Sequence, residues 1–208
     1  EGSVGLITYM RTDSVRISED ALKEARDYIS SHFGNEYLPS KPRYLKTKSA
    51  AQDAHEAIRP SYAERDSESL KEWLSTDQQK LYKLIWDRFL ASQMEPAIFD
   101  TISVEIQGNP KTLDGKTVLN LRASGSKLVF KGFMALYVEG KDDEENETSQ
   151  MLPSINKDEN LALVNTDPNQ HFTEPPARYT EATLVKALEE KGIGRPSTYA
   201  PTISTIIN

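Results

Sequence analysis

Residues 5–14 read Gly-Leu-Ile-Thr-Tyr-Met-Arg-Thr-Asp-Ser, and the interpretation of the whole chain depends on this stretch. The apolar pair Leu6-Ile7 predicts a short buried strand that begins after Gly5. The next seven residues carry the phenol of Tyr9, the guanidinium of Arg11, the carboxylate of Asp13 and three hydroxyls. If the segment stays extended, Tyr9 and Arg11 point to the same side, because side chains alternate along a strand.

A tyrosine beside a fixed cation is suited to attack on a phosphodiester. Tyr9 would supply the nucleophilic oxygen, and Arg11 would stabilise the charge on the phosphate oxygens. A core tyrosine with a surface ion pair is the structural alternative, and composition alone favours it, because such tyrosines are common.

The composition bounds the class of protein. The 208 residues are enough to bury a core, and the net charge of −7 argues against a uniformly basic nucleic-acid coat. DNA binding is not excluded, because it depends on the local electrostatic field of the binding groove and not on the net charge. A basic cluster is formed by Lys41, Arg43, Lys46 and Lys48. The chain has no cysteine, no apolar run of membrane-spanning length and no signal peptide, so we expect a soluble, cytoplasmic protein.

A second polar motif, Gln-Asp-Ala-His-Glu-Ala-Ile-Arg-Pro, occupies residues 52–60. It is not a zinc motif of the His-Glu-x-x-His type, because Arg59 stands where the second histidine is needed. The spacing predicts a helical turn with His55 and Arg59 on one face and Glu56 beside them. A structural histidine is the alternative to a functional one, and the basic loop before the motif is either a solvated surface or a phosphate contact.

A third motif, Gly-Arg-Pro-Ser-Thr-Tyr at residues 194–199, opens the last predicted helix, with Ser197 as its N-cap. A helix N-terminus that carries free amides, hydroxyls and Arg195 is suited to bind a phosphate. An ordinary turn with a capping serine is the alternative.

Apolar spacing predicts the other helices. One runs over residues 19–33 behind Ser18 as N-cap, a short one over residues 67–74, and one begins at Thr180 and ends at Lys191-Gly192. A stronger helix begins with a Thr76–Gln79 capping box. Its predicted core positions are Leu81, Tyr82, Leu84, Ile85, Trp86 and Phe89.

From Phe99 onward the apolar period becomes two, which predicts strands. The predicted strands cover residues 99–106, 117–123, 128–130 and 161–164, with turns at residues 108–110, 114–115 and Gly125. A small antiparallel sheet with a structural role is expected. The fold class is therefore α+β, and Pro96 and Pro175-Pro176 predict domain boundaries that give segments 1–95, 96–174 and 175–208.

The Ile-Thr-Tyr-Met-Arg-Thr-Asp-Ser run resembles the active-site signature of type IA DNA topoisomerases, and Met10 fits the bacterial topoisomerase I branch best. Residues 54–61 and 175–199 resemble two further segments of that family. The resemblance implies relaxation of negatively supercoiled DNA through single-strand cleavage, a 5′-phosphotyrosyl intermediate, strand passage and religation. Topoisomerase III and reverse gyrase are the alternatives within the family.

The resemblance also implies roles for individual residues. Tyr9 is expected to be the nucleophile and Arg11 the transition-state stabiliser. The expected DNA-binding residues are Thr8, Asp13, His55, Arg59, Arg195, Ser197 and Thr198, with Asp13 orienting neighbouring groups and Arg59 assigned less firmly than His55.

By the same resemblance the chain is a multi-lobed fragment of the toroidal enzyme. Residues 1–95 are expected to form a helical cap lobe, residues 96–174 a β arch, and residues 175–208 the start of a helical single-strand-binding domain. The Toprim domain that binds Mg²⁺ in the parent enzyme is expected to precede residue 1, and no metal site is expected in this chain. The expected partners are single-stranded or negatively supercoiled DNA and that Toprim domain, in the bacterial nucleoid and without a membrane. In isolation the chain is expected to act as a non-catalytic single-strand-binding or gate module.

Overall fold

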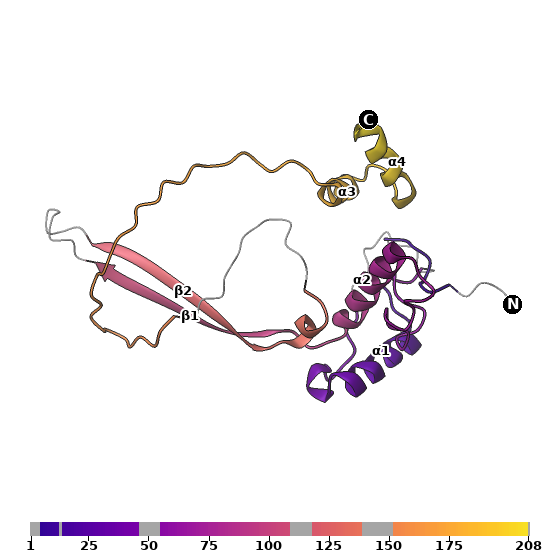
Figure 1. The fold of residues 1–208 in the computed structure, drawn as a ribbon, viewed down its shortest axis with the longest axis horizontal. Coiled ribbons are helices and arrows are strands. Elements are labelled where there is room, and N and C mark those ends of the chain that lie inside the picture. Colours follow the sequence, from indigo (N-terminus) through magenta and orange to yellow (C-terminus); the bar gives the residue numbers. More distant parts are fainter. Residues whose placement is uncertain (1–4, 13, 46–54, 109–117, 139–151, 208) are drawn as a thin grey trace. The chain divides into compact units, whose positions relative to one another are not determined.

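The computed structural model describes residues 5–12, 14–45, 55–108, 118–138 and 152–207. The elements in order are α1 (Glu19–His32), η1 (Asn35–Tyr37), α2 (Thr76–Ser92), β1 (Ile98–Gly108), β2 (Leu119–Phe130), η2 (Gly132–Ala135), α3 (Glu181–Glu190) and α4 (Pro196–Ile207). They are shown in Figure 1. Helices together with an antiparallel strand pair confirm the α+β class. The chain divides into two compact units between residues 157 and 158. The boundaries at residues 96 and 174 remain predictions.

The helix α1 follows its prediction closely. Ser18 caps it by accepting a hydrogen bond from the Ala21 amide, and Leu22, Ala25 and Ile29 form its buried face. The helix ends at His32, one residue before the predicted end. Local capping and apolar spacing are therefore sufficient to define this element.

The helix α2 begins one residue away from the predicted capping box. Ser75 and Gln78 form a reciprocal box, in which each side chain bonds the other's backbone amide, so the predicted Thr76–Gln79 box is wrong. Gln79 instead donates from its side-chain amide to the Ser67 carbonyl, at 3.3 Å.

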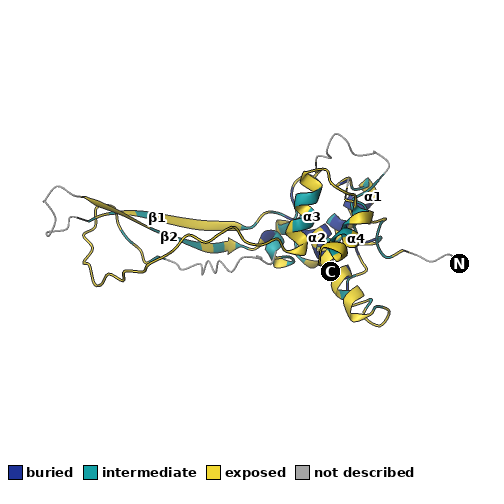
Figure 2. Ribbon diagram, turned by 90° about the horizontal axis from the view of Figure 1, so that it is seen from above, coloured by how far each residue is buried: buried dark blue, intermediate teal, exposed yellow. Residues whose placement is uncertain are grey.

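The buried face of α2 is narrower than predicted. Tyr82, Trp86 and Phe89 are buried, but Leu81 and Leu84 are exposed, so their assignment to the core is wrong. The buried face of α2, which also holds Leu90, packs in one core with residues of α1. Leu81 and Leu84 lie on the other side of the helix and are exposed. Figure 2 shows the buried residues gathered in the helical part of the first unit, away from the strands.

Residues 67–74 form turns, and the helix predicted there is wrong. The backbone bonds in this segment are of the i to i−3 kind, such as Trp73 to Leu70 at 3.0 Å, so no α-helical ladder develops. Two side chains of α2 hold the preceding turns: Trp86 donates to the Ala63 carbonyl at 2.9 Å, and the Tyr82 hydroxyl donates to the Arg65 carbonyl at 2.6 Å.

The strands β1 and β2 form one antiparallel hairpin, the only sheet in the described part of the chain. Gly125 pairs with Ile102 inside β2, so the turn predicted at Gly125 is wrong, and the two short strands predicted around it are one strand. Residues 161–164 are not a strand, which corrects a further prediction. Asn109, Pro110 and the turn predicted at residues 114–115 lie outside the described residues.

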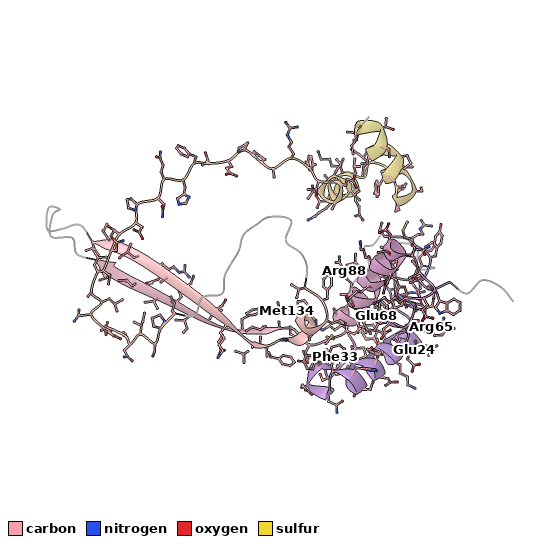
Figure 3. The ribbon with its side chains drawn as sticks, in the orientation of Figure 1. Glu24, Phe33, Arg65, Glu68, Arg88 and Met134 are labelled. Atoms are coloured by element: carbon pink, nitrogen blue, oxygen red, sulfur yellow. The ribbon has the colours of Figure 1, made fainter. Side chains whose placement is uncertain are left out.

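The base of the hairpin is attached to the helical part of the first unit. The Glu95 amide donates to the Tyr37 carbonyl and the Phe133 amide to the Glu95 carbonyl, both at 2.8 Å. The rings of Tyr37 and Phe130 lie 4.8 Å apart. Arg88 of α2, labelled in Figure 3, lies over the ring of Tyr137 at 5.4 Å.

The second unit holds α3 and α4. Thr180 and Thr183 form a capping box at the start of α3, and the helix stops at Lys191 and Gly192 as predicted. The N-cap predicted at Ser197 is wrong, because α4 already begins at Pro196. Proline is favoured at the first position of a helix, where its missing amide costs no hydrogen bond. None of the helices in the described ranges is long and apolar enough to cross a membrane.

Candidate active site around Tyr9

The Tyr9 segment is held by the segment that carries His55. Ile7 and Pro60 form an isolated antiparallel bridge, and the Thr8 amide donates to the Arg59 carbonyl at 2.9 Å. Residues 55–60 are not helical, so the predicted helical turn with His55 and Arg59 on one face is wrong. Their backbone groups bond across to the Tyr9 segment instead of within a helical turn. The short buried strand predicted at Leu6-Ile7 is wrong, because only an isolated bridge forms at Ile7 and both residues are half-buried.

Two hydroxyls reinforce this pairing. Thr8 Oγ1 donates to the Ala57 carbonyl at 2.7 Å and accepts from the Arg59 amide at 3.0 Å. Ser14, which is buried, donates to the His55 carbonyl at 2.7 Å. Thr8 thus has an internal role, and its contact with DNA remains a prediction. Ser14 received no role from the sequence, although its hydroxyl is part of the same polar run.

Tyr9, Arg11 and His55 come together on this frame. Tyr9 is 76% exposed, and its ring centroid lies 6.4 Å from that of His55. Arg11 Nη1 lies 3.4 Å from His55 Nε2. A guanidinium has only donors, so His55 Nε2 is the acceptor in this contact. His55 Nδ1 is buried and has no hydrogen-bond partner among the described residues.

Arg59 braces the segment from within. Its Nε and Nη2 both donate to Glu56 Oε2, at 2.9 and 2.5 Å, and its Nη1 donates to the Pro60 carbonyl at 3.0 Å. The ion pair is largely buried, with side-chain exposures of 13% for Arg59 and 25% for Glu56. A guanidinium engaged in this way fixes the backbone beside Thr8, and its contact with DNA remains a prediction.

The other predicted site residues lie elsewhere in the chain. Asp13 is outside the described residues. Arg195, Ser197 and Thr198 lie at the start of α4 in the second unit, and all three are exposed. Thr198 Oγ1 accepts from the Arg195 amide at 2.8 Å, which satisfies one of the amides that a helix N-terminus leaves without an intrahelical partner.

The described residues offer no metal site of their own, since they contain no group of three or more His, Cys, Asp or Glu side chains that could hold an ion. The Mg²⁺ that the resemblance implies for a Toprim domain remains a prediction.

An exposed tyrosine beside an arginine–histidine pair combines a possible nucleophile with a fixed positive charge. A family model described as DNA topoisomerase matches residues 2–208, and the chain belongs to that family. Full-length topoisomerase I from Thermotoga maritima has a similar structure, with 34% sequence identity and a TM-score of 0.70. The similarity covers 99% of this chain and 31% of that chain. The resemblance to bacterial type IA topoisomerases seen in the sequence is thereby confirmed.

Proposed function

We propose that this chain is the part of a bacterial topoisomerase I that cleaves and rejoins one DNA strand, so that negatively supercoiled DNA is relaxed. The observation that carries the proposal is the exposed Tyr9 phenol beside the Arg11–His55 pair. Family membership supports DNA as the substrate. The bacterial nucleoid is the location that this function requires.

In the proposed reaction Tyr9 attacks the phosphorus of a phosphodiester. The phenol loses its proton, a bond forms between the Tyr9 oxygen and phosphorus, and the bond from phosphorus to the 3′ oxygen breaks. The 3′ oxygen takes up a proton, and the 5′-phosphate stays on Tyr9 as an ester. Religation is the reverse of this step, after an intact strand has passed through the gap.

The other residues bind and orient the strand. Arg11 stabilises the charge that develops on the phosphate oxygens, and the contact from its Nη1 to His55 fixes its direction. We propose that His55, Thr8, Asp13 and Arg59 contact or position the strand near Tyr9. We propose that Arg195, Ser197 and Thr198 bind phosphates of the DNA, because the start of α4 offers an exposed arginine and exposed hydroxyls together.

Attack by Tyr9 needs a proton acceptor as well as the Arg11–His55 pair. A phenol is almost wholly protonated at neutral pH, so it needs a base and an electrophilic phosphate. Glu56 lies in the His55 segment, but it is engaged by Arg59. We therefore propose that a Toprim domain with Mg²⁺ completes the site, and that the chain by itself binds single strands without cleaving them.

The test is covalent adduct formation on labelled single-stranded DNA with Mg²⁺, followed by denaturing electrophoresis. Adducts are expected when the chain is combined with a Toprim domain, and none with the chain alone. Tyr9→Phe removes only the reacting oxygen and should abolish adducts, whereas Tyr62→Phe, another exposed tyrosine, should keep them. Adducts from Tyr9→Phe would refute the proposed nucleophile. Adducts from the chain alone would refute the need for the Toprim domain.

A further inference from the structure

Ser14 carries a buried hydroxyl that the proposed reaction does not use. The residue is 6% exposed. Its Oγ donates to the His55 carbonyl at 2.7 Å and accepts from the Arg16 amide at 3.2 Å. A hydroxyl has one proton to donate, and here that proton is directed at the peptide of His55. Ser14 therefore joins the end of the Tyr9 motif to the backbone of the residue whose ring contacts Arg11.

The ring of His55 is held weakly by its own nitrogens. Nε2 accepts from Arg11 Nη1 at 3.4 Å, which is long for a hydrogen bond. Nδ1 is buried and has no hydrogen-bond partner among the described residues. The direction of the ring therefore depends on how firmly the backbone of His55 is placed.

The neighbouring backbone is held from both sides. The Ala57 amide donates to the Arg16 carbonyl at 2.7 Å, and the Ala57 carbonyl accepts from Thr8 Oγ1 at 2.7 Å. These bonds place the segment as a whole. Ser14 bonds the carbonyl of His55 itself, so its loss would free the peptide that carries the ring.

We propose that Ser14 is a positioning residue for cleavage: its hydroxyl holds the His55 backbone so that the ring meets Arg11 beside Tyr9. The inference rests on the proposed function, since cleavage is the step that it serves. Ser14 acts through His55 and not on the reacting atoms. A misplaced ring leaves the Arg11 guanidinium without its direction, and such misplacement slows chemistry even where the strand still binds.

Ser61 offers a matched comparison. Its Oγ donates to the Gly5 carbonyl at 2.6 Å, across the same two segments as the Ser14 bond. It lies at the other end of the pairing, beyond the bridge between Ile7 and Pro60. Removal of the Ser61 hydroxyl weakens the same pairing without touching the peptide of His55, so it measures the general effect of losing one such bond.

The first measurement is NMR on the chain combined with a Toprim domain, with histidines labelled in the chain alone. The chain has three histidines, and a His55→Gln variant assigns the His55 imidazole signals. Ser14→Ala should shift these signals and leave the other two histidines unchanged, whereas Ser61→Ala should shift none of them. Unchanged His55 signals in Ser14→Ala would overturn the proposal.

The second measurement is the rate of adduct formation with the same combined protein. Ser14→Ala should slow the rate at saturating DNA, by up to about a hundredfold, and leave the half-saturating DNA concentration unchanged. Ser61→Ala should keep the wild-type rate. In a His55→Ala background, Ser14→Ala should cause no further loss, because the group through which it acts is gone. Losses of equal size in both backgrounds would refute a role through His55.

Two further variants separate the hydroxyl from the shape of the side chain. Ser14→Thr keeps a hydroxyl and should recover most of the rate and the His55 signals. Ser14→Cys keeps the shape with a much weaker donor and should behave like Ser14→Ala. It replaces the alanine variant if urea denaturation shows that Ser14→Ala does not fold. A cysteine variant with the wild-type rate would contradict the role of the hydroxyl.

The outcomes separate this inference from the proposed function. If the wild type forms adducts and Ser14→Ala matches Ser61→Ala in rate, the positioning role is wrong and the Tyr9 chemistry stands. If the wild type forms no adducts, the proposed function is wrong, and the role of Ser14 in cleavage is wrong with it. The NMR comparison then still decides whether Ser14 places His55.

Discussion

Arg11 Nη1 lies 3.4 Å from His55 Nε2, although 44 positions separate the two residues in the sequence. The contact joins the Tyr9 segment to residues 55–60, beside a tyrosine that remains exposed. A guanidinium carries five N–H donors, so a bond to His55 is compatible with further bonds to a phosphate. The Arg11–His55 contact thus holds the Arg11 guanidinium near Tyr9, the proposed nucleophile.

The first prediction concerns this pair. When the chain is combined with a Toprim domain, Arg11→Ala should slow adduct formation by a factor on the order of a hundred or more. This is the usual effect of losing one transition-state donor. His55→Ala should slow it less, because Arg11 remains but is no longer directed. Since the two residues are in contact, the double variant should be less impaired than the product of the single effects. Rates from quenched time courses measure this, and strictly multiplicative effects would mean that the contact has no role in cleavage.

The second prediction concerns the hydroxyl of Thr8. Thr8→Val keeps the shape but leaves the Ala57 carbonyl and the Arg59 amide without this partner. The free energy of unfolding should fall by about 1–3 kcal/mol, the usual effect of an unmade buried hydrogen bond. Thr8→Ser is the matched control, since it keeps the hydroxyl, and it should lie closer to the wild type. Urea denaturation gives both values, and a Val variant as stable as the wild type would contradict the bracing role.

The elements that the sequence predicts well are those with local determinants. Ser18 and Thr180 cap the helices for which they were proposed, and the capping box of α2 lies one residue before its predicted place. The alternation in β1 is visible in the structure where Val104 and Ile106 are half-buried between exposed neighbours. The prediction of a turn at Gly125 is wrong, because strand pairing with Ile102 outweighs the preference of glycine for turns.

The site depends on contacts that local patterns do not encode. A spacing of four between His55 and Arg59 fits a helical face, but the same residues serve an extended segment whose partner is Thr8. Likewise Leu81 has helical spacing with Ile85 and Phe89 but is exposed on α2, because the direction of the core is set by Trp86 and Ile29 together. The resemblance of the motifs predicted which residues matter, and the structure adds how Arg11 and His55 are joined.

The third prediction concerns Gly132 at the base of the hairpin. Its φ of +48° is unfavourable for other residues, and a Cβ there would collide with the backbone of Pro96 and Glu95. Gly132→Ala should therefore lower the free energy of unfolding by more than 1 kcal/mol, the upper part of the usual range for single substitutions. Gly108→Ala is the control, because its nearest new contact is an ordinary 3.7 Å. Equal urea midpoints for the two variants would show that the close contact of Gly132 with the backbone of Pro96 and Glu95 does not require a glycine.

The fourth prediction concerns the start of α4. If Arg195 contacts a phosphate, Arg195→Ala should weaken single-strand binding to a similar extent for all sequences and reduce the salt dependence by the amount expected for one contact. Lys186→Ala, which removes a positive charge from α3, is the control and should change neither quantity. Anisotropy titrations with two unrelated oligonucleotides measure both, and a sequence-dependent loss would indicate a base contact instead.

The last prediction concerns Tyr82 and alkaline pH. The pKa of Tyr82 is raised to about 12, mainly by burial, while Arg65 acts to lower it and Asp66 to raise it. In the unfolded chain the phenol titrates near 10. Between these values the folded protein keeps a proton that the unfolded chain has lost, so the stabilisation is complete below about pH 10 and disappears as the pH rises toward about 12.

Tyr82→Phe should be less stable at pH 8, by about 1 kcal/mol, because the hydroxyl no longer donates to the Arg65 carbonyl. Its free energy of unfolding should nevertheless fall less steeply than that of the wild type as the pH increases from 10 to 12. Lysines and the other tyrosines titrate in both proteins, so the difference between the two slopes isolates Tyr82. Tyr62→Phe controls for the loss of an exposed hydroxyl and should follow the wild type. Urea denaturation at a series of alkaline pH values measures the slopes, and parallel curves for Tyr82→Phe and the wild type would mean that Tyr82 ionises alike in the folded and unfolded chain.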